Sequence, residues 1–200
     1  MTSPRRMGTE SSKTRLLLLD TVERLMVEEG YAAVGVRRVA REAGVAPALV
    51  LYYFRTLDDL FLAVVRRRSE QEIQAQTRAL KSDRLIGSLW DHSSQPEGAV
   101  LNLEFIALAN HRKAIRGELS AHAERLRRLQ MEAVEGYLKE RGIGSDELSP
   151  LALTVLISTL SRSLVLEDAM GLTLGHDEVL ALVERYLRRP IDDRPARKED

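Results

Sequence analysis

The residues best suited to chemistry lie between Gly30 and Phe61 of this 200-residue chain. Tyr52 and Tyr53 are adjacent, so their hydroxyls can donate hydrogen bonds to phosphate oxygens and their rings can lie against a sugar or a thymine methyl group. Guanidinium groups flank this pair, on Arg37, Arg38, Arg41 and Arg55. Tyrosine hydroxyls beside arginines favour contacts with the backbone and the base edges of duplex DNA.

Two short helical segments would position these side chains. The spacing of apolar residues predicts helices over 36–43 and 47–54. Gly44 follows the first segment, where a left-handed residue would end a helix. Pro47 suits the first turn of the second segment, because its missing N–H group has no helical partner there.

A longer helix over 13–29, ended by Gly30, would pack behind these segments and complete a helix-turn-helix. In that motif the second helix enters the major groove, and here Val50 and Phe54 are expected to face inward. The residues expected at the DNA are Gly35, Arg37, Arg38, Ala46, Pro47, Ala48, Leu49, Leu51, Tyr52, Tyr53 and Arg55.

Four short motifs follow one another in this region. They are Gly30-Tyr31, Ala40-Arg41-Glu42-Ala43-Gly44-Val45, Tyr52-Tyr53-Phe54 and Asp58-Asp59-Leu60. In content and order they resemble the DNA-binding domain of the tetracycline-repressor (TetR) family. The resemblance implies a regulator that binds a palindromic operator as a homodimer, usually as a repressor, and is released when a small molecule displaces its fourth helix.

The segment departs from the family pattern at four positions. Gly35 and Ala46 stand where the family commonly has a hydroxyl residue that caps a helix, so side-chain capping is lost there. Leu51 replaces a common Tyr, and Leu57 replaces a frequent Lys. Each departure removes a polar contact to DNA, whereas the buried residues and the turn match.

The composition favours helices throughout the chain. The sequence has 12 Gly, 6 Pro and 4% aromatic residues, and 44% of its residues are hydrophobic, which suits a helical protein with a real core. The absence of Cys excludes a disulfide scaffold, a thiolate zinc site and a cysteine nucleophile. We therefore predict an all-α fold.

The net charge is zero, but the charge is unevenly distributed. Residues 1–68 hold 12 Lys and Arg against 8 Asp and Glu, and the remainder holds 18 against 22. A cationic first third suits a module that binds a polyanion. The polar start is no signal peptide, and Arg162 interrupts the most apolar stretch, so we expect no membrane span and a cytoplasmic protein.

Beyond the motif, apolar spacing predicts helices over 57–80, 84–90, 99–116, 118–141, 151–170 and 178–188, with a break near Gly117. We expect about nine helices in all. The expected organisation is a disordered arm (1–12), a three-helix helix-turn-helix domain (13–56), a larger helical ligand-binding and dimerisation domain (57–189) and a disordered tail (190–200).

A ligand pocket in the larger domain should be aliphatic, because aromatic residues are sparse after the first third. The effector is accordingly expected to be lipophilic. Candidate pocket residues are Trp90, Asn102, Phe105, Asn110, His111, Ser158 and Arg162. Arg162 has two further interpretations, as a partner of Glu167 or as part of a dimer interface.

The last two predicted helices carry the stripes expected to form a homodimer. The small-residue strip of the first helix and the apolar stripe of the second comprise Ala152, Val155, Thr159, Ser163, Val179, Leu180, Val183 and Leu187. The alternative is that both stripes are buried within one subunit.

Enzyme motifs are absent from the sequence. None of His92, His111, His122 and His176 has a Glu three residues earlier, as a di-iron bundle requires, and no nucleophile elbow or phosphate-binding glycine loop occurs. We expect no catalysis, metal or cofactor. The rival hypothesis is a helical-bundle enzyme or lipid carrier whose N-terminal motif is purely structural.

Overall fold

The computed structural model describes residues 13–195, apart from the side chain of Glu97. The expected arm at 1–12 and the last five residues lie outside this part of the chain. All regular structure within 13–195 is helical, which confirms the all-α prediction. The chain forms two compact units. The first comprises the chain up to Ser69 together with Val100–Ser120, and the second comprises Glu70–Ala99 together with the chain from Ala121 onward.

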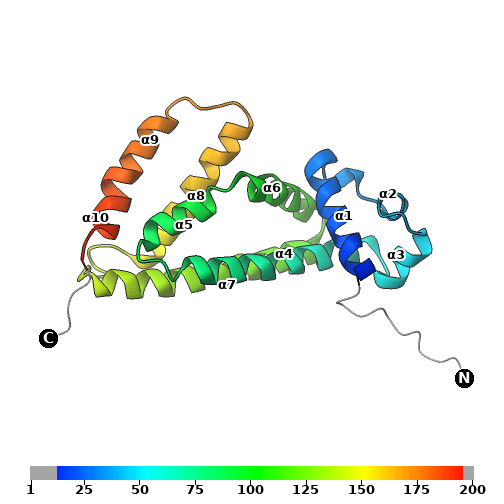
Figure 1. Ribbon diagram of the computed structural model, residues 1–200, viewed down its shortest axis with the longest axis horizontal. Helices are drawn as coiled ribbons and strands as arrows, with labels where there is room; N and C mark the ends of the chain where they lie inside the picture. The colour runs from blue at the N-terminus through cyan, green and yellow to red at the C-terminus, as the bar shows by residue number, and fades with distance from the viewer. Residues whose placement is uncertain (1–12, 196–200) are drawn as a thin grey trace, which may run out of the picture. The chain divides into compact units, whose positions relative to one another are not determined.

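The first unit contains the helix-turn-helix (Figure 1). Its elements are α1 (Lys13–Glu29), η1 (Tyr31–Ala33), α2 (Val36–Glu42), α3 (Pro47–Tyr53) and parts of α4 (Leu57–Ala79), α6 (Pro96–His111) and α7 (Lys113–Glu140). The predicted bounds of α1 are confirmed, and α2 and α3 each end one residue earlier than expected.

The core of the first unit is built from apolar faces at helical spacing. Leu18, Val22, Leu25 and Met26 of α1 are fully buried, as their spacing predicts. The same core takes Val39 and Ala40 from α2, Val50 from α3, Phe54 directly after α3, Leu60, Phe61, Val64 and Val65 from α4, and Leu101, Phe105, Leu108 and Ile115 from the 100–120 segment. The start of α4 is therefore part of this unit rather than of a separate domain beginning at residue 57.

The break between α6 and α7 lies at Arg112 and not at Gly117, so the predicted break was wrong by one turn. Gly117 lies inside α7, where a glycine weakens a helix without ending it. Arg112 pairs with Asp58, and its guanidinium lies 5.3 Å from the ring centre of Phe61. The break between α6 and α7 therefore coincides with contacts between Arg112 and residues more than 50 positions away in the sequence.

The second unit contains α5 (Leu85–Ser93), α8 (Pro150–Ala169), α9 (His176–Val183), the π-helical segment η2 (Glu184–Arg188) and α10 (Arg189–Asp192). Its core comprises Leu85, Ile86, Leu89, Trp90, Val134, Tyr137, Leu138, Ile143, Leu153, Ile157, Val183 and Ile191. The ranges predicted for α5 and α9 overlap with the observed helices, and α8 matches its prediction within one residue at each end.

The last described helix corrects the expected tail at 190–200. Pro190 lacks an N–H group, and in a regular helix its ring would crowd the carbonyl four residues earlier, which explains the wider π-helical turn before it. Beyond it, Asp192 is buried and its carboxylate accepts hydrogen bonds from the backbone N–H groups of Ile86 (3.1 Å) and Gly87 (2.8 Å). Asp192 therefore caps α5, whose own N-cap residue supplies no side-chain hydrogen bond.

Tyr137 completes this buried polar cluster. Its hydroxyl lies 2.8 Å from Asp192 Oδ1 and 2.7 Å from the carbonyl oxygen of Asp83, and it can donate to either. The Arg141 guanidinium lies 3.5 Å from the centre of the Tyr137 ring. Burial and the neighbouring carboxylate of Asp192 raise the pKa of Tyr137 to about 12.

We expect Tyr137 to make the protein sensitive to alkali. Its pKa is higher in the folded state than the ordinary value of about 10, so its stabilising contribution is complete below pH about 10 and is lost as the pH rises through about 12. The difference in unfolding free energy between wild type and Tyr137→Phe should shrink over this range, measured by urea denaturation at fixed pH. A constant difference between pH 9 and 12 would contradict this assignment.

Candidate DNA-binding surface and ligand pocket

The turn between α2 and α3 is closed by its backbone. The N–H of Val45 donates to the carbonyl of Ala40 at 2.9 Å across Gly44, whose φ is +66°. This six-residue closure with a left-handed glycine is the Schellman motif, and it uses the left-handed Gly44 that the sequence predicted. Ala46 then precedes α3 without a side-chain cap, and Pro47 occupies its first turn.

The two faces of α3 are separated as expected. Val50 and Phe54 are 0% and 4% exposed, which confirms the predicted inner face. On the other side, Leu51 and Tyr52 are 46% and 38% exposed. Tyr53 is half-buried against the core, and its ring meets that of Tyr52 edge-on at 5.2 Å, so Tyr52 is the more accessible of the two tyrosines.

The remaining candidates lie along the same surface. Pro47 and Ala48 are exposed at the start of α3, and Leu49 is half-buried. Gly35 precedes α2 in extended backbone and offers no side-chain cap. Arg55 is exposed directly after α3.

Arg38 is held by carboxylates within the first unit. Its guanidinium lies 2.6 Å from Glu29 and 3.2 Å from Glu42. Glu42 also accepts a hydrogen bond from Arg24 of α1, and this bond lowers the pKa of Glu42 below its usual range. Arg38 thus joins α2 to the end of α1, while its neighbour Arg37 is exposed.

The arginine run of α4 makes contacts within the same unit. Arg67 is largely buried and its guanidinium lies 2.5 Å from Glu23 and 2.7 Å from Asp20, which ties α4 to α1. Arg66 lies 2.8 Å from Glu118. Charge runs on long helices usually form a solvated face, and Arg67 departs from this because its partners lie on the packed side of α4.

The start of α4 is fixed by a reciprocal cap. The N–H of Asp59 donates to Thr56 Oγ1 at 3.0 Å, and the N–H of Thr56 donates to Asp59 Oδ2 at 3.1 Å. The two bonds satisfy the backbone N–H groups of Thr56 and Asp59 at the start of α4. The cap supports the chain as it leaves the candidate DNA-binding surface.

The predicted ligand residues do not form one cluster. Trp90 belongs to the core of the second unit and Phe105 to the core of the first. Asn102 is half-buried, whereas Asn110 and His111 are exposed, all three in the first unit.

Ser158 and Arg162 are neighbours on α8. Arg162 Nε donates to the carbonyl of Ser158 at 2.8 Å, and the guanidinium is exposed. The expected pairing of Arg162 with Glu167 was wrong, because Glu167 lies 3.0 Å from His176 Nε2 instead.

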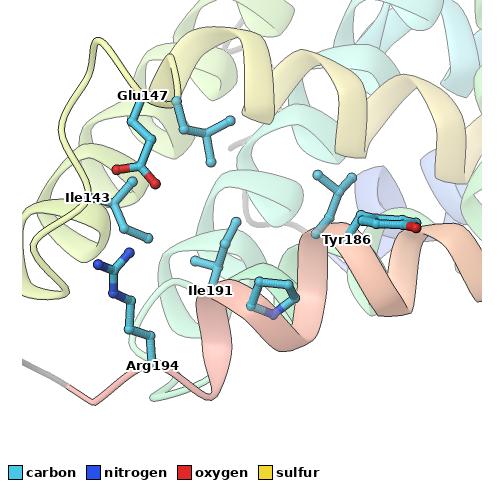
Figure 2. A pocket seen from close by; sticks show the side chains of 8 residues that line it. Ile143, Glu147, Tyr186, Ile191 and Arg194 are labelled. Carbon is cyan, nitrogen blue, oxygen red and sulfur yellow. The ribbon is translucent and has the colours of Figure 1, made fainter.

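A pocket of about 220 Å³ lies elsewhere in the second unit. Its lining residues are Ile143, Glu147, Leu148, Tyr186, Leu187, Pro190, Ile191 and Arg194. Figure 2 shows the charged groups of Glu147 and Arg194 at one end, near Ile143, with Tyr186 at the other end. Apolar periodicity does not predict this site, because its charged residues lie in a loop and after the last described helix, where there is no helical period to follow.

The predicted dimer residues divide into exposed and buried sets. On α8, Ala152 and Thr159 are exposed and Val155 and Ser163 are half-buried. On α9, Leu180 is exposed, but Val183 is only 4% exposed within the subunit's own core. Val179 and Leu187 pack partly against that core, so the alternative of burial within one subunit holds for this side of the stripe.

Further apolar side chains are exposed around these helices. They are Leu151, Leu156, Met170, Leu172, Leu174, Leu182 and Tyr186. By length and composition alone, α8 could cross a membrane, although it also supplies Leu153 and Ile157 to the core. Among the described residues, no group of three or more acidic or histidine side chains could hold a metal ion.

Comparison with known proteins identifies the first unit. Residues 18–64 match the sequence model of the bacterial regulatory proteins of the tetR family. The chain is 29% identical over 122 residues to the HTH-type transcriptional regulator BetI of Rhizobium meliloti (strain 1021). This alignment covers 56% of the chain and 60% of the relative, so the chain spans less than two thirds of that relative's length.

Solved structures share the fold over most of the chain. A protein of Rhodococcus sp. assigned to the TetR family of transcriptional regulators has a TM-score of 0.72 at 19% identity, over 90% of this chain and 100% of its own. A protein of Saccharomonospora viridis, described as a transcriptional regulator and crystallised with choline, has a TM-score of 0.73 at 19% identity, over 87% and 97%.

Proposed function

We propose that this chain, which belongs to the TetR family of bacterial regulatory proteins, binds a palindromic DNA operator and represses transcription until a small molecule releases it. One observation carries the proposal. Within the residues that match the family, backbone hydrogen bonds close the turn between α2 and α3. Val50 of α3 and Phe54 directly after it are buried, whereas Leu51 and Tyr52 face outward. This is the arrangement that places one helix face in a major groove.

The DNA contacts divide into two classes. The outer face of α3 carries no charge, so it would read base edges and methyl groups through Leu51 and Tyr52. Arg37, Arg41 and Arg55 would contact phosphates, because they are exposed next to this face. Arg38 is assigned a structural part, since its two carboxylate partners already neutralise it.

Selection from a randomised duplex pool tests DNA binding directly. The wild-type protein should enrich a two-fold symmetric site, and Tyr52→Ala should weaken binding to that site by about 1–3 kcal/mol if the ring touches a base. Arg37→Ala should weaken all duplexes alike and reduce the slope of log affinity against log salt by about one. Arg125→Ala, in the second unit, serves as the control and should leave both quantities unchanged.

The outcome also separates this proposal from its rival. If no duplex is enriched while the protein is folded by circular dichroism, the N-terminal motif is only structural. A helical-bundle enzyme or lipid carrier would then be the better hypothesis.

We propose homodimerisation through the outer faces of α8 and α9. The small residues Ala152 and Thr159 lie beside Leu156, which is 54% exposed, and Leu180 is exposed on α9. Apolar surface of this kind marks an interaction site, and a two-fold axis there would match a palindromic operator. Val183 is left out of this interface because it is buried in its own subunit.

Leu156→Glu should yield monomers. The added carboxylate would face the partner's apolar surface without a counter-charge, so we expect dissociation at micromolar concentration in sedimentation and weaker operator binding. Arg128→Glu, on exposed α7 surface, is the control and should remain dimeric. A wild-type protein that sediments as a monomer would refute the arrangement.

We propose that the effector is a small, mainly aliphatic molecule. Aromatic residues of the second unit are few, and Trp90 and Tyr137 are committed to its core, which leaves no aromatic cage for a flat or quaternary cation among its described residues. The pocket at Ile143 and Ile191 combines aliphatic side chains with the charged groups of Glu147 and Arg194 at one end. Choline, bound by the Saccharomonospora protein, is the natural comparison.

Thermal-shift measurements with medium-chain fatty acids, fatty alcohols and choline test the effector class. An aliphatic compound should raise the melting temperature and weaken operator binding, and by linkage the operator should weaken its binding by the same factor. Stabilisation by choline alone would overturn the aliphatic assignment.

A further inference from the structure

The DNA-binding unit includes a segment that lies far from its motif in sequence. Val100–Ser120 belongs to the first compact unit, although the family match ends at residue 64. Leu101, Phe105 and Leu108 of this segment are buried in the same core as Val50 and Phe54 of α3. The segment therefore packs as part of the helix-turn-helix unit.

Polar contacts tie this segment to the motif at three successive points. Glu104 accepts a hydrogen bond from the N–H of Tyr31 at 2.7 Å. Arg112 pairs with Asp58 at the start of α4, and Glu118 lies 2.8 Å from Arg66 further along that helix. The first of these contacts holds the chain just before α2, and the second holds it just after α3.

Glu104 supports a turn that local backbone hydrogen bonds close but that has no local side-chain cap. Gly30 has φ +82° and supplies no side-chain cap, so the N–H of Tyr31 begins η1 without a local side-chain acceptor. The Glu104 carboxylate fills this place, and a Cβ atom on Gly30 would lie 3.4 Å from its Oε2 atom. A side chain at residue 30 would therefore strain the backbone, while its Cβ atom would only touch the carboxylate.

This turn determines where the DNA-facing helices begin. Only η1 and Val34 separate it from Gly35, the residue that starts α2. The turn after α2 is closed by backbone hydrogen bonds, and α2 packs against α3, so a shift at Tyr31 is passed to both helices. Glu104 is therefore the hydrogen-bond acceptor that fixes the position of the chain where it enters α2 and α3.

We propose that Glu104 is a positioning residue for DNA recognition, which orients α2 and α3 from α6 by holding the backbone of Tyr31. This inference rests on the proposed DNA-binding function. It assigns to α6 a part in recognition that does not require any contact between α6 and DNA.

The test uses the full-length protein and the duplex that the wild type selects from a random pool. Glu104→Ala removes the acceptor and should weaken binding about tenfold, whereas Glu104→Gln keeps an acceptor oxygen and should stay within about threefold of wild type. In 15N-labelled protein the amide resonance of Tyr31 should move in Glu104→Ala and stay near its wild-type position in Glu104→Gln. Helix content by circular dichroism should be the same in all three proteins.

Glu124→Ala is the matched control, since Glu124 is an exposed carboxylate on α7 whose partner Arg128 lies on the same helix. It should bind the duplex like wild type. Unchanged affinity in a folded Glu104→Ala protein would overturn the proposal, and so would equal losses in the Ala and Gln variants.

If Glu104→Ala does not fold, Glu104→Asp decides. A folded Asp variant with a displaced Tyr31 resonance and full affinity overturns the proposal, and one with reduced affinity supports it. A wild type that selects no duplex contradicts the proposed function instead.

Discussion

Burial of one face of α3 is the constraint on which the proposed DNA-binding surface depends. This helix has seven residues, no charged side chain and no side-chain cap, so it would not persist alone in water. Val50 and Phe54 anchor it in a core shared with α1, α4 and α6. Because these residues face inward, Leu51 and Tyr52 must face outward. The orientation of the recognition surface therefore follows from packing and not from polar contacts of the helix itself.

The elements around this surface were predictable because their signals are local. Gly30, Gly44 and Pro47 mark the ends and starts of helices through their own backbone preferences, and α1, α2 and α3 begin and end within one residue of prediction. The burial of Leu18, Val22, Leu25 and Met26 followed from a 3.6-residue period, whereas the equally buried Leu19 was not predicted. Arg37 and Arg38 show where this reasoning stops. They are adjacent and chemically identical, yet Arg38 lies against Glu29 and Glu42, whereas Arg37 is exposed.

The features that sequence reasoning missed depend on partners distant in the chain. Asp192 caps α5 through the amides of Ile86 and Gly87, more than 100 positions away, and this contact keeps residues 190–192 from forming part of a loose tail. Arg112 likewise meets Asp58 and Phe61 where α6 ends. Composition does not predict such contacts, because a charged residue near a chain end can equally well be solvated or cap a distant helix.

Apolar periodicity has a related ambiguity. It shows that a helix face is apolar, but it does not show what packs against that face. Leu180 and Val183 are one turn apart on α9, yet Val183 lies in the core with Leu153 and Ile157, whereas Leu180 meets solvent. On α8 the same division separates Ile157 from its exposed neighbour Leu156. A single subunit has used the inner faces of both helices. In the proposed homodimer the outer faces would contact a second copy, and a two-fold axis there would impose on the two α3 helices the symmetry that a palindromic site requires.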